Sequence, residues 1–81
     1  MEIREKIHKD SSRKYVLKNR IRELRKEKGF SQEELAALAF TTQNTISSLE
    51  TGVSEPTAYT SGLICHALGC TWDECFYYED K

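Results

Sequence analysis

The sequence predicts an all-α domain of five short helices, and three observations support this prediction. Apolar residues recur at helical intervals of three or four, while the alternation typical of strands is confined to Tyr15-Val16-Leu17. Residues that can cap a helix N-terminus precede the expected helices, and glycine follows most of them. At 81 residues the chain has room for a single small core, since a domain of this size buries only about 60% of the surface that its unfolded chain exposes.

The chain divides into a short N-terminal extension, residues 1–18, and a helical domain, residues 19–77. In the extension Ile3 and Ile7 are four residues apart and could share one face of a helical turn. Asp10-Ser11-Ser12 would break that turn or cap a new one. The domain therefore begins at about Asn19.

The first two helices of the domain have clear end signals. Asn19 can cap a helix that runs to about Lys28 and is ended by Gly29. Ser31 can cap the second helix, and Glu34 three residues later completes an S-x-x-E capping box before an apolar pair. This box is the strongest local signal in the chain.

The remaining three helices each begin after a threonine. Thr42 can cap a helix over residues 43–50 that ends at Gly52. Thr57 can open a fourth helix, and Thr71 a short fifth helix. The apolar stripe expected to close the bundle runs through these last two helices at intervals of four and consists of Ile64, Leu68, Trp72 and Phe76.

The charges are unevenly distributed along the chain. Residues 1–30 hold 11 Lys and Arg against 5 Asp and Glu, a balance of +6, whereas residues 31–81 hold one Lys against 8 acids, a balance of −7. The net charge of −1 therefore conceals a basic half and an acidic half. A phosphate backbone could be approached by one face of the domain only.

Residues 31–50 form two short helices joined by a tight turn, which is typical of a helix-turn-helix. Short, uncharged polar side chains occupy the outward face of the second helix. Asn and Gln amides can bind an adenine edge in two places, and Ser can contact several base edges. Gln32 begins the preceding helix, where free N–H groups favour a phosphate. A merely solvated polar face is the alternative interpretation of the candidate base-reading residues, which are Gln43, Asn44, Ser47 and Ser48.

The segment SQEELAALAFTTQNTISSLETG, with NRIRELRKEKGF before it and EPTAYTSGLICHALGCTWDECF after it, resembles the lambda-repressor-like helix-turn-helix of the Xre/Cro family of phage and bacterial regulators. The resemblance covers about residues 19–76. It implies a compact five-helix domain that binds a pseudo-palindromic operator as a homodimer, with the helix 43–50 in the major groove. By position, the DNA contacts that the resemblance implies fall on Gln32, Thr42, Gln43, Asn44, Ser47 and Ser48.

The resemblance also implies a structural salt bridge between Arg25 and Glu50. Glu50 follows the apolar Leu49 at a helix C-terminus, where the helix dipole disfavours a negative charge. A cationic partner would compensate for both the dipole and the burial.

The sequence departs from the family pattern in the turn and after the second helix. Phe40 stands where the family usually has glycine, so either the turn differs or about 1 kcal/mol of strain is tolerated. Val53, Ser54 and Glu55 follow Gly52 where a basic phosphate contact is common. Loss of that contact weakens non-specific affinity. The basic residues that could compensate are Arg13, Lys14, Lys18, Arg20 and Arg22.

Three cysteines and one histidine could suggest a metal site, because sulfur and imidazole are zinc ligands. The spacing of Cys65, His66, Cys70 and Cys75 matches no compact zinc pattern, however, and the resemblance places the cysteines in the core. We therefore expect core cysteines and no metal or other cofactor. Nothing supports catalysis by a cysteine activated by His8 or His66, so an enzyme is not expected.

The sequence thus predicts a cytoplasmic, sequence-specific regulator of transcription, acting as a repressor on double-stranded DNA. We expect no membrane association and no small-molecule ligand. Dimerisation is expected through the extension or near the fourth helix, where Leu38, Tyr59 and Leu63 stand at positions that are usually polar in the family. The alternative is a protein-interaction module of the same fold, antitoxin-like or antirepressor-like, which the acidic second half favours.

Overall fold

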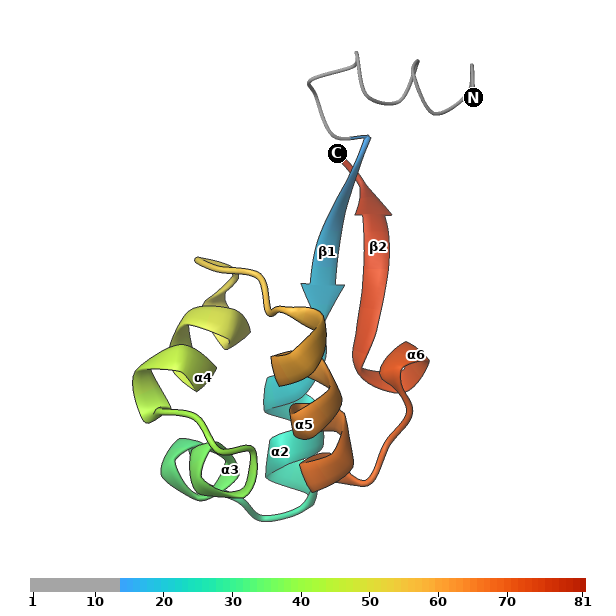
Figure 1. Cartoon of the computed structure of the whole chain (residues 1–81). Helices are drawn as coiled ribbons and strands as arrows, with labels where there is room; N and C mark the ends of the chain where they lie inside the picture. The colour runs from blue at the N-terminus through green and yellow to red at the C-terminus, as the bar shows by residue number, and fades with distance from the viewer. Residues whose placement is uncertain (1–13) are drawn as a thin grey trace.

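The computed structural model describes residues 14–81. In this part of the chain, a group of packed helices carries a two-stranded ribbon formed by segments from its two ends (Figure 1). The expected stripe of Ile3 and Ile7 lies outside the described residues. The elements are β1 (Tyr15–Asn19), α2 (Ile21–Glu27), α3 (Gln32–Leu38), α4 (Gln43–Thr51), α5 (Ala58–Leu68), α6 (Trp72–Cys75) and β2 (Phe76–Asp80).

Side-chain caps begin four of the helices where the sequence predicts them. Ser31 and Glu34 form the complete capping box of α3, with the Ser31 N–H donating to the Glu34 carboxylate at 2.8 Å. Thr71 starts α6 with the same motif. Thr42 and Thr57 accept the N–H groups of residues three positions later at the starts of α4 and α5. The predicted starts of these helices are confirmed, since each cap satisfies a backbone donor that the helix leaves free.

The ends of the domain form an antiparallel ribbon, so the expectation of an all-α fold was wrong there. β1 pairs with β2 in a register that runs from Tyr15 opposite Asp80 to Asn19 opposite Phe76. β1 starts inside the segment 1–18 that was expected to be an extension and crosses its expected boundary with the domain. Short strands are stable only when paired, and the partner of β1 lies at the other end of the chain. Local periodicity could not reveal it.

The fifth helix is shorter than expected because Phe76 leaves it. At Phe76 the backbone is extended, with φ −120° and ψ 145°, and β2 begins there. Phe76 belongs to β2, and its side chain is buried in the core. Trp72 remains 37% exposed and stacks on Phe76, with the two ring centres 5.2 Å apart. The predicted four-residue stripe is therefore interrupted at α6, and the core is closed by the first residue of a strand.

The start of the first helix also differs from the prediction. Arg20 is the N-cap residue of α2 and makes no side-chain cap. Asn19 still accepts the Ile21 N–H at 3.1 Å, and its amide donates to the Leu49 carbonyl at 2.9 Å. Asn19 thus ties the end of β1 to α4 as well as to α2.

The core lies between α2, α3, α4, α5 and the start of β2. Leu35 and Ala39 of the α3 region pack with Ile46 and Leu49 of α4, which sets the angle between these two helices. No helix within residues 14–81 is long and apolar enough to span a bilayer. The buried hydrophobic residues are Ile21, Leu35, Ala36, Ala39, Ile46, Leu49, Ile64, Cys65, Leu68, Cys75 and Phe76.

The turn between α3 and α4 is left-handed at Phe40, where φ is +56°. The glycine-type conformation is therefore kept, and the alternative of a different turn is ruled out. The backbone of a residue that carries a Cβ atom is strained at this positive φ. Phe40 is also 84% exposed, so packing of its ring gives little in return.

Phe40→Gly is expected to raise the free energy of unfolding by about 1 kcal/mol, because glycine adopts this conformation without strain. Urea denaturation of both proteins measures the change. Phe40→Ala is the matched control, since it removes the ring but keeps the Cβ atom. An equal gain from both variants would show that the exposed ring, and not the backbone, is the cause.

Candidate nucleic-acid interface

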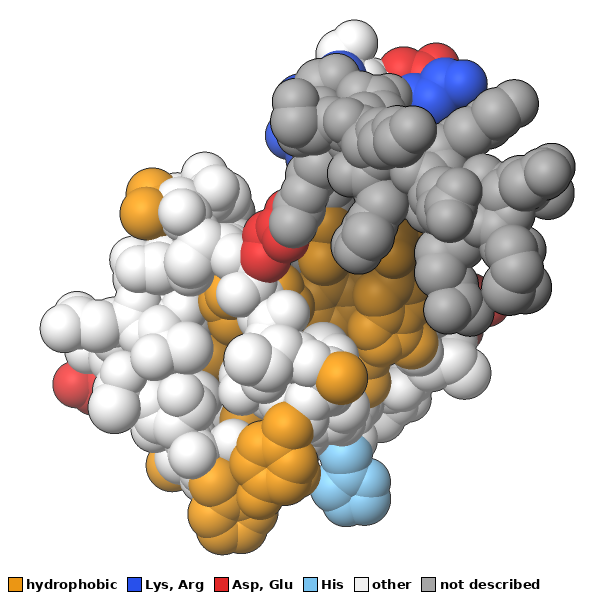
Figure 2. Space-filling model, turned by 45° about the horizontal axis from the view of Figure 1, so that its top comes forward, with side chains coloured by type: hydrophobic (Ala, Val, Ile, Leu, Met, Phe, Trp, Pro, Cys, Tyr) orange, Lys and Arg blue, Asp and Glu red, His pale blue; other side chains and the backbone are white. Residues whose placement is uncertain are grey.

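The outward face of α4 is polar and carries few charges. Gln43 and Asn44 are exposed in its first turn, and Ser47 and Ser48 follow one turn later, half-buried. Residues three and four apart lie on one face of a helix, so these four side chains form a continuous surface. On the side of the molecule where α4 lies, Figure 2 shows mainly uncharged polar side chains and backbone. Such a surface can exchange hydrogen bonds without requiring a fixed charge opposite it.

Thr42 stands at the edge of this surface and has a structural role of its own. Its hydroxyl accepts the Thr45 N–H at 3.2 Å and lies 3.0 Å from the Thr45 hydroxyl. A hydroxyl has one donor and two acceptor sites. Capping therefore leaves Thr42 with capacity for one further hydrogen bond.

Gln32 links the two helices of the helix-turn-helix. Its amide nitrogen donates to Glu50 Oε1 at 3.1 Å, and its amide oxygen accepts from Gln43 at 3.3 Å. Gln32 thus holds Gln43 in place from the start of α3. From the residues alone we predicted only a phosphate contact for Gln32, because amide partners across a turn leave no signal in the spacing.

Arg25 and Glu50 form a buried ion pair beneath the surface. Arg25 Nε lies 2.7 Å from Glu50 Oε2, and their side chains are 10% and 0% exposed. A second guanidinium nitrogen of Arg25 donates to the Phe30 carbonyl at 2.8 Å. Arg22 adds a contact to Glu50 Oε1 at 3.3 Å. The pair joins α2 to the C-terminal end of α4, and Arg25 also binds the α2–α3 connection at Phe30.

The surroundings keep Glu50 ionised. Burial alone would raise its pKa, but hydrogen bonds from Arg25, Gln32 and Arg22, together with the charge of Arg25, lower the pKa below the ordinary value. The carboxylate therefore carries its charge at neutral pH and accepts from three side chains. Asn44, by contrast, has no side-chain partner within residues 14–81 and is available for an external one.

Of the basic side chains expected to supplement this surface, one lies near α4 and the other described ones lie at the β1–β2 ribbon. Arg22 contacts Glu50 and is 54% exposed, so it lies near α4. Arg20 instead stacks on the Tyr77 ring, with its guanidinium carbon 4.2 Å from the ring centre. Lys14 precedes β1 and Lys18 lies on it, both exposed. Arg13 lies outside the described residues.

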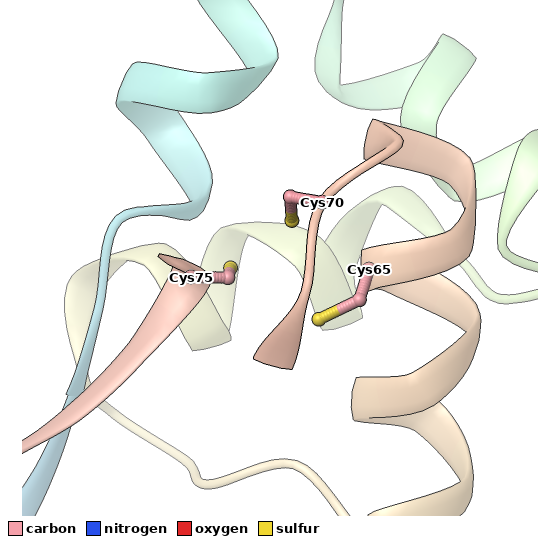
Figure 3. Close-up of side chains that lie close together, drawn as sticks. All are labelled: Cys65, Cys70 and Cys75. Carbon is pink, nitrogen blue, oxygen red and sulfur yellow. The ribbon is translucent and has the colours of Figure 1, made fainter. Parts of the chain in front are cut away.

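The three cysteines of the chain come together at the hydrophobic core. Their Sγ atoms all lie within 4.8 Å of one another, and Figure 3 shows them directed into one space. Burial raises the pKa of Cys65 to about 11 and that of Cys75 to about 12, with a further contribution from the neighbouring thiols. Cys65 and Cys75 are core residues as expected, but their convergence with Cys70 was not predicted by the spacing.

Comparison with known proteins assigns the helical part of the chain to a family. A helix-turn-helix family model matches residues 21–75, which extends from the start of α2 to the end of α6. The chain belongs to the Xre/Cro family of helix-turn-helix proteins. This Xre/Cro domain is 31% identical over 65 residues to YgzD of Bacillus subtilis, an uncharacterized HTH-type transcriptional regulator, and the match covers 80% of this chain and 98% of YgzD.

Solved structures agree with this assignment. The clp gene regulator ClgR of Corynebacterium glutamicum is 31% identical and superposes with a TM-score of 0.63 over 67% of this chain and 70% of that one. A Bacteroides fragilis protein shares the fold at 22% identity, with a TM-score of 0.70 over 76% of this chain and 100% of its own. Family and relatives together support a DNA-binding regulator.

Arg25→Ala is expected to lower the free energy of unfolding by about 3–5 kcal/mol, because it leaves the buried Glu50 charge without its main partner. Thermal and urea denaturation measure the loss. Arg22→Ala is the matched control: it removes a more exposed contact to the same carboxylate and should cost less than about 1 kcal/mol. Equal losses from the two variants would contradict the central role of Arg25.

The lowered pKa of Glu50 predicts an acid-sensitive contribution to stability. The unfolded carboxyl has the higher pKa, so the contribution is fully present above the ordinary value of 4.5 and is lost as the pH falls through the lower, folded pKa. Urea denaturation at a series of pH values should show this decline in the native protein and a shallower one in Glu50→Gln. Identical slopes would mean that other carboxyl groups cause the decline.

Proposed function

We propose that the protein is a sequence-specific regulator of transcription that reads double-stranded DNA by placing α4 in the major groove. The observation that carries this proposal is the exposed amide pair Gln43 and Asn44 on the first turn of α4, in a domain of the Xre/Cro family. A recognition helix contacts base edges mainly through its N-terminal residues. Gln43 and Asn44 occupy that position.

Each polar residue of the surface receives a distinct role in this proposal. Asn44 and Gln43 bind base edges, with adenine as the preferred partner of an amide. Ser47 and Ser48 are half-buried, so they contact only those DNA groups that come close to the surface of α4. Thr42 uses its remaining hydrogen-bonding capacity at the edge of the groove. Gln32 contacts a phosphate near the N-terminus of α3, which positions the protein without selecting a base.

The proposed operator is pseudo-palindromic and is bound by a homodimer. Two copies would then place their α4 helices about 34–36 Å apart, one turn of DNA. Leu38 and Tyr59 are exposed apolar side chains and supply surface for self-association, whereas Leu63 packs against the core. A dimer of this size bound over a promoter excludes other proteins from it, so we propose repression.

The exposed segment after α4 supports a second candidate function. Val53, Ser54 and Glu55 replace the basic residue that often contacts phosphate there, and all three are exposed. An acid near the DNA backbone weakens binding to phosphate. A protein-interaction module of the same fold would be unaffected by this acid.

Gln43→Ala and Asn44→Ala are each expected to cost about 1–3 kcal/mol at one base position and to relax the preference there. Gln32→Ala is the contrasting variant, since loss of a phosphate contact weakens binding to all sequences. Because Gln32 also holds Gln43, the comparison is made at the base position read by Asn44, where Gln32→Ala should keep the native preference. Fluorescence anisotropy with a panel of single-base operator variants measures both effects. If the two α4 variants bound the whole panel as the native protein does, the assignment of base readout would be wrong.

Selection of bound duplexes from a random DNA pool at moderate salt tests the function itself. We expect enrichment of a pseudo-palindrome whose affinity falls steeply with added salt, because bound phosphates release counterions. A folded sample that enriches no sequence would favour the protein-interaction module, and capture of a protein partner would then be the next step.

A further inference from the structure

The cysteine cluster, consisting of Cys65, Cys70 and Cys75, is built from three different parts of the fold. Cys65 lies in the last turns of α5, Cys70 in the α5–α6 connection and Cys75 at the end of α6. Their sulfur atoms nevertheless all lie within 4.8 Å of one another, as Figure 3 shows. These are the only three cysteines of the chain, and all are free thiols. Three soft ligand atoms are therefore present within the reach of a single ion.

The number of ligands limits which ion the cluster can hold. Structural zinc sites are almost always four-coordinate. Within residues 14–81 the group contains three sulfurs and no histidine or carboxylate, and the adjacent His66 is exposed. The geometry thus fits an ion that is satisfied by three sulfur ligands.

Burial limits the charge of the complex. Cys65 and Cys75 belong to the hydrophobic core, and Cys70 packs against it. An uncompensated charge in such surroundings is costly. Three thiolates leave a net charge of −1 around a divalent ion and of −2 around a monovalent ion, but they neutralise a trivalent ion. The half-buried Cys70 gives an entry path from solvent.

We infer that Cys65, Cys70 and Cys75 form a binding site for a trivalent thiophilic metalloid ion, of which arsenic(III) supplied as arsenite is the representative. This inference concerns α5 and α6 and does not rest on DNA binding. It assigns to the cysteines a role beyond packing of the core.

The binding step is a condensation without oxidation or reduction. Neutral arsenous acid, As(OH)₃, reacts with the three thiols; three As–S bonds form, three As–O bonds break, and the thiol protons leave with the hydroxyl groups as three water molecules. Arsenic stays trivalent and each sulfur keeps its oxidation state. No charge is created in the core, in contrast to binding of Zn²⁺, which must displace three protons to give an anionic site.

Native mass spectrometry of the reduced full-length chain with sodium arsenite tests the stoichiometry. A phosphine must serve as the reductant, because thiol reductants would compete for arsenic. The expected adduct adds one arsenic and loses three hydrogens. An adduct that retains a hydroxyl group would show that only two thiols react, and it would overturn the three-sulfur site, as would the absence of any adduct.

Thermal denaturation tests whether the site belongs to the folded protein. A ligand that binds the native state in preference to the unfolded chain raises Tm, so arsenite should raise Tm progressively as its concentration increases. An unchanged or lowered Tm would mean that arsenite binds cysteines without the folded arrangement. A larger rise with Zn²⁺ than with arsenite would overturn the assignment of a trivalent ion.

Cys70→Ser is the most informative variant, because Cys70 is only half-buried and its replacement disturbs the core least. It should abolish the arsenite-dependent rise in Tm and leave at most the two-thiol adduct. Cys65→Ala provides a second test if Cys70→Ser unfolds. His66→Ser is the matched control on the same segment of α5 and should retain the three-thiol adduct. If Cys70→Ser responded to arsenite like the native chain, the inference would be wrong.

Discussion

The buried ion pair between Arg25 and Glu50 is the interaction on which the placement of the polar surface depends. It links α2 to the C-terminal end of α4, and Gln32 extends the same network to the start of α3. Each of these helices is short, and a short helix has little stability of its own. Their relative positions must therefore come from shared contacts, of which this network is the polar part and the packing of Leu35 with Ile46 the apolar part.

The network also explains how an uncharged surface can be held firmly. Glu50 accepts hydrogen bonds from Arg25, Gln32 and Arg22, and Gln32 accepts one from Gln43. A charge buried in the domain thus orders a neutral amide at its surface through one intermediate side chain. Hydrogen bonds to an ionised group are stronger than those between neutral groups, so the order is greatest close to Glu50.

Local signals in the sequence predicted most of the helical part. They could not predict contacts between segments that are far apart in the sequence. The starts of α3 and α4 were predictable because Ser31 and Thr42 cap them through residues only three positions away. The ribbon was missed because the pairing of Tyr15 with Asp80 depends on segments from opposite ends of the described chain. The short distance between the Cys70 and Cys75 sulfur atoms depends likewise on the direction of α6, which the spacing of the residues does not determine. For the polar surface, the residue types and their shared face could be predicted. The link from Gln32 to Gln43 could not, because it depends on the angle at which α3 and α4 meet.

The ribbon has a consequence for the order in which the chain becomes structured during synthesis. The ribosome releases β1 first among the described elements, but its partner β2 emerges only after every helix. Until then the hydrogen-bonding edges of β1 have no native partner, while α2 to α5 can already associate. Unpaired strand edges promote aggregation. The edges of β1 thus stay unpaired from its own emergence until that of β2, and slow translation of the residues between them would prolong the exposure.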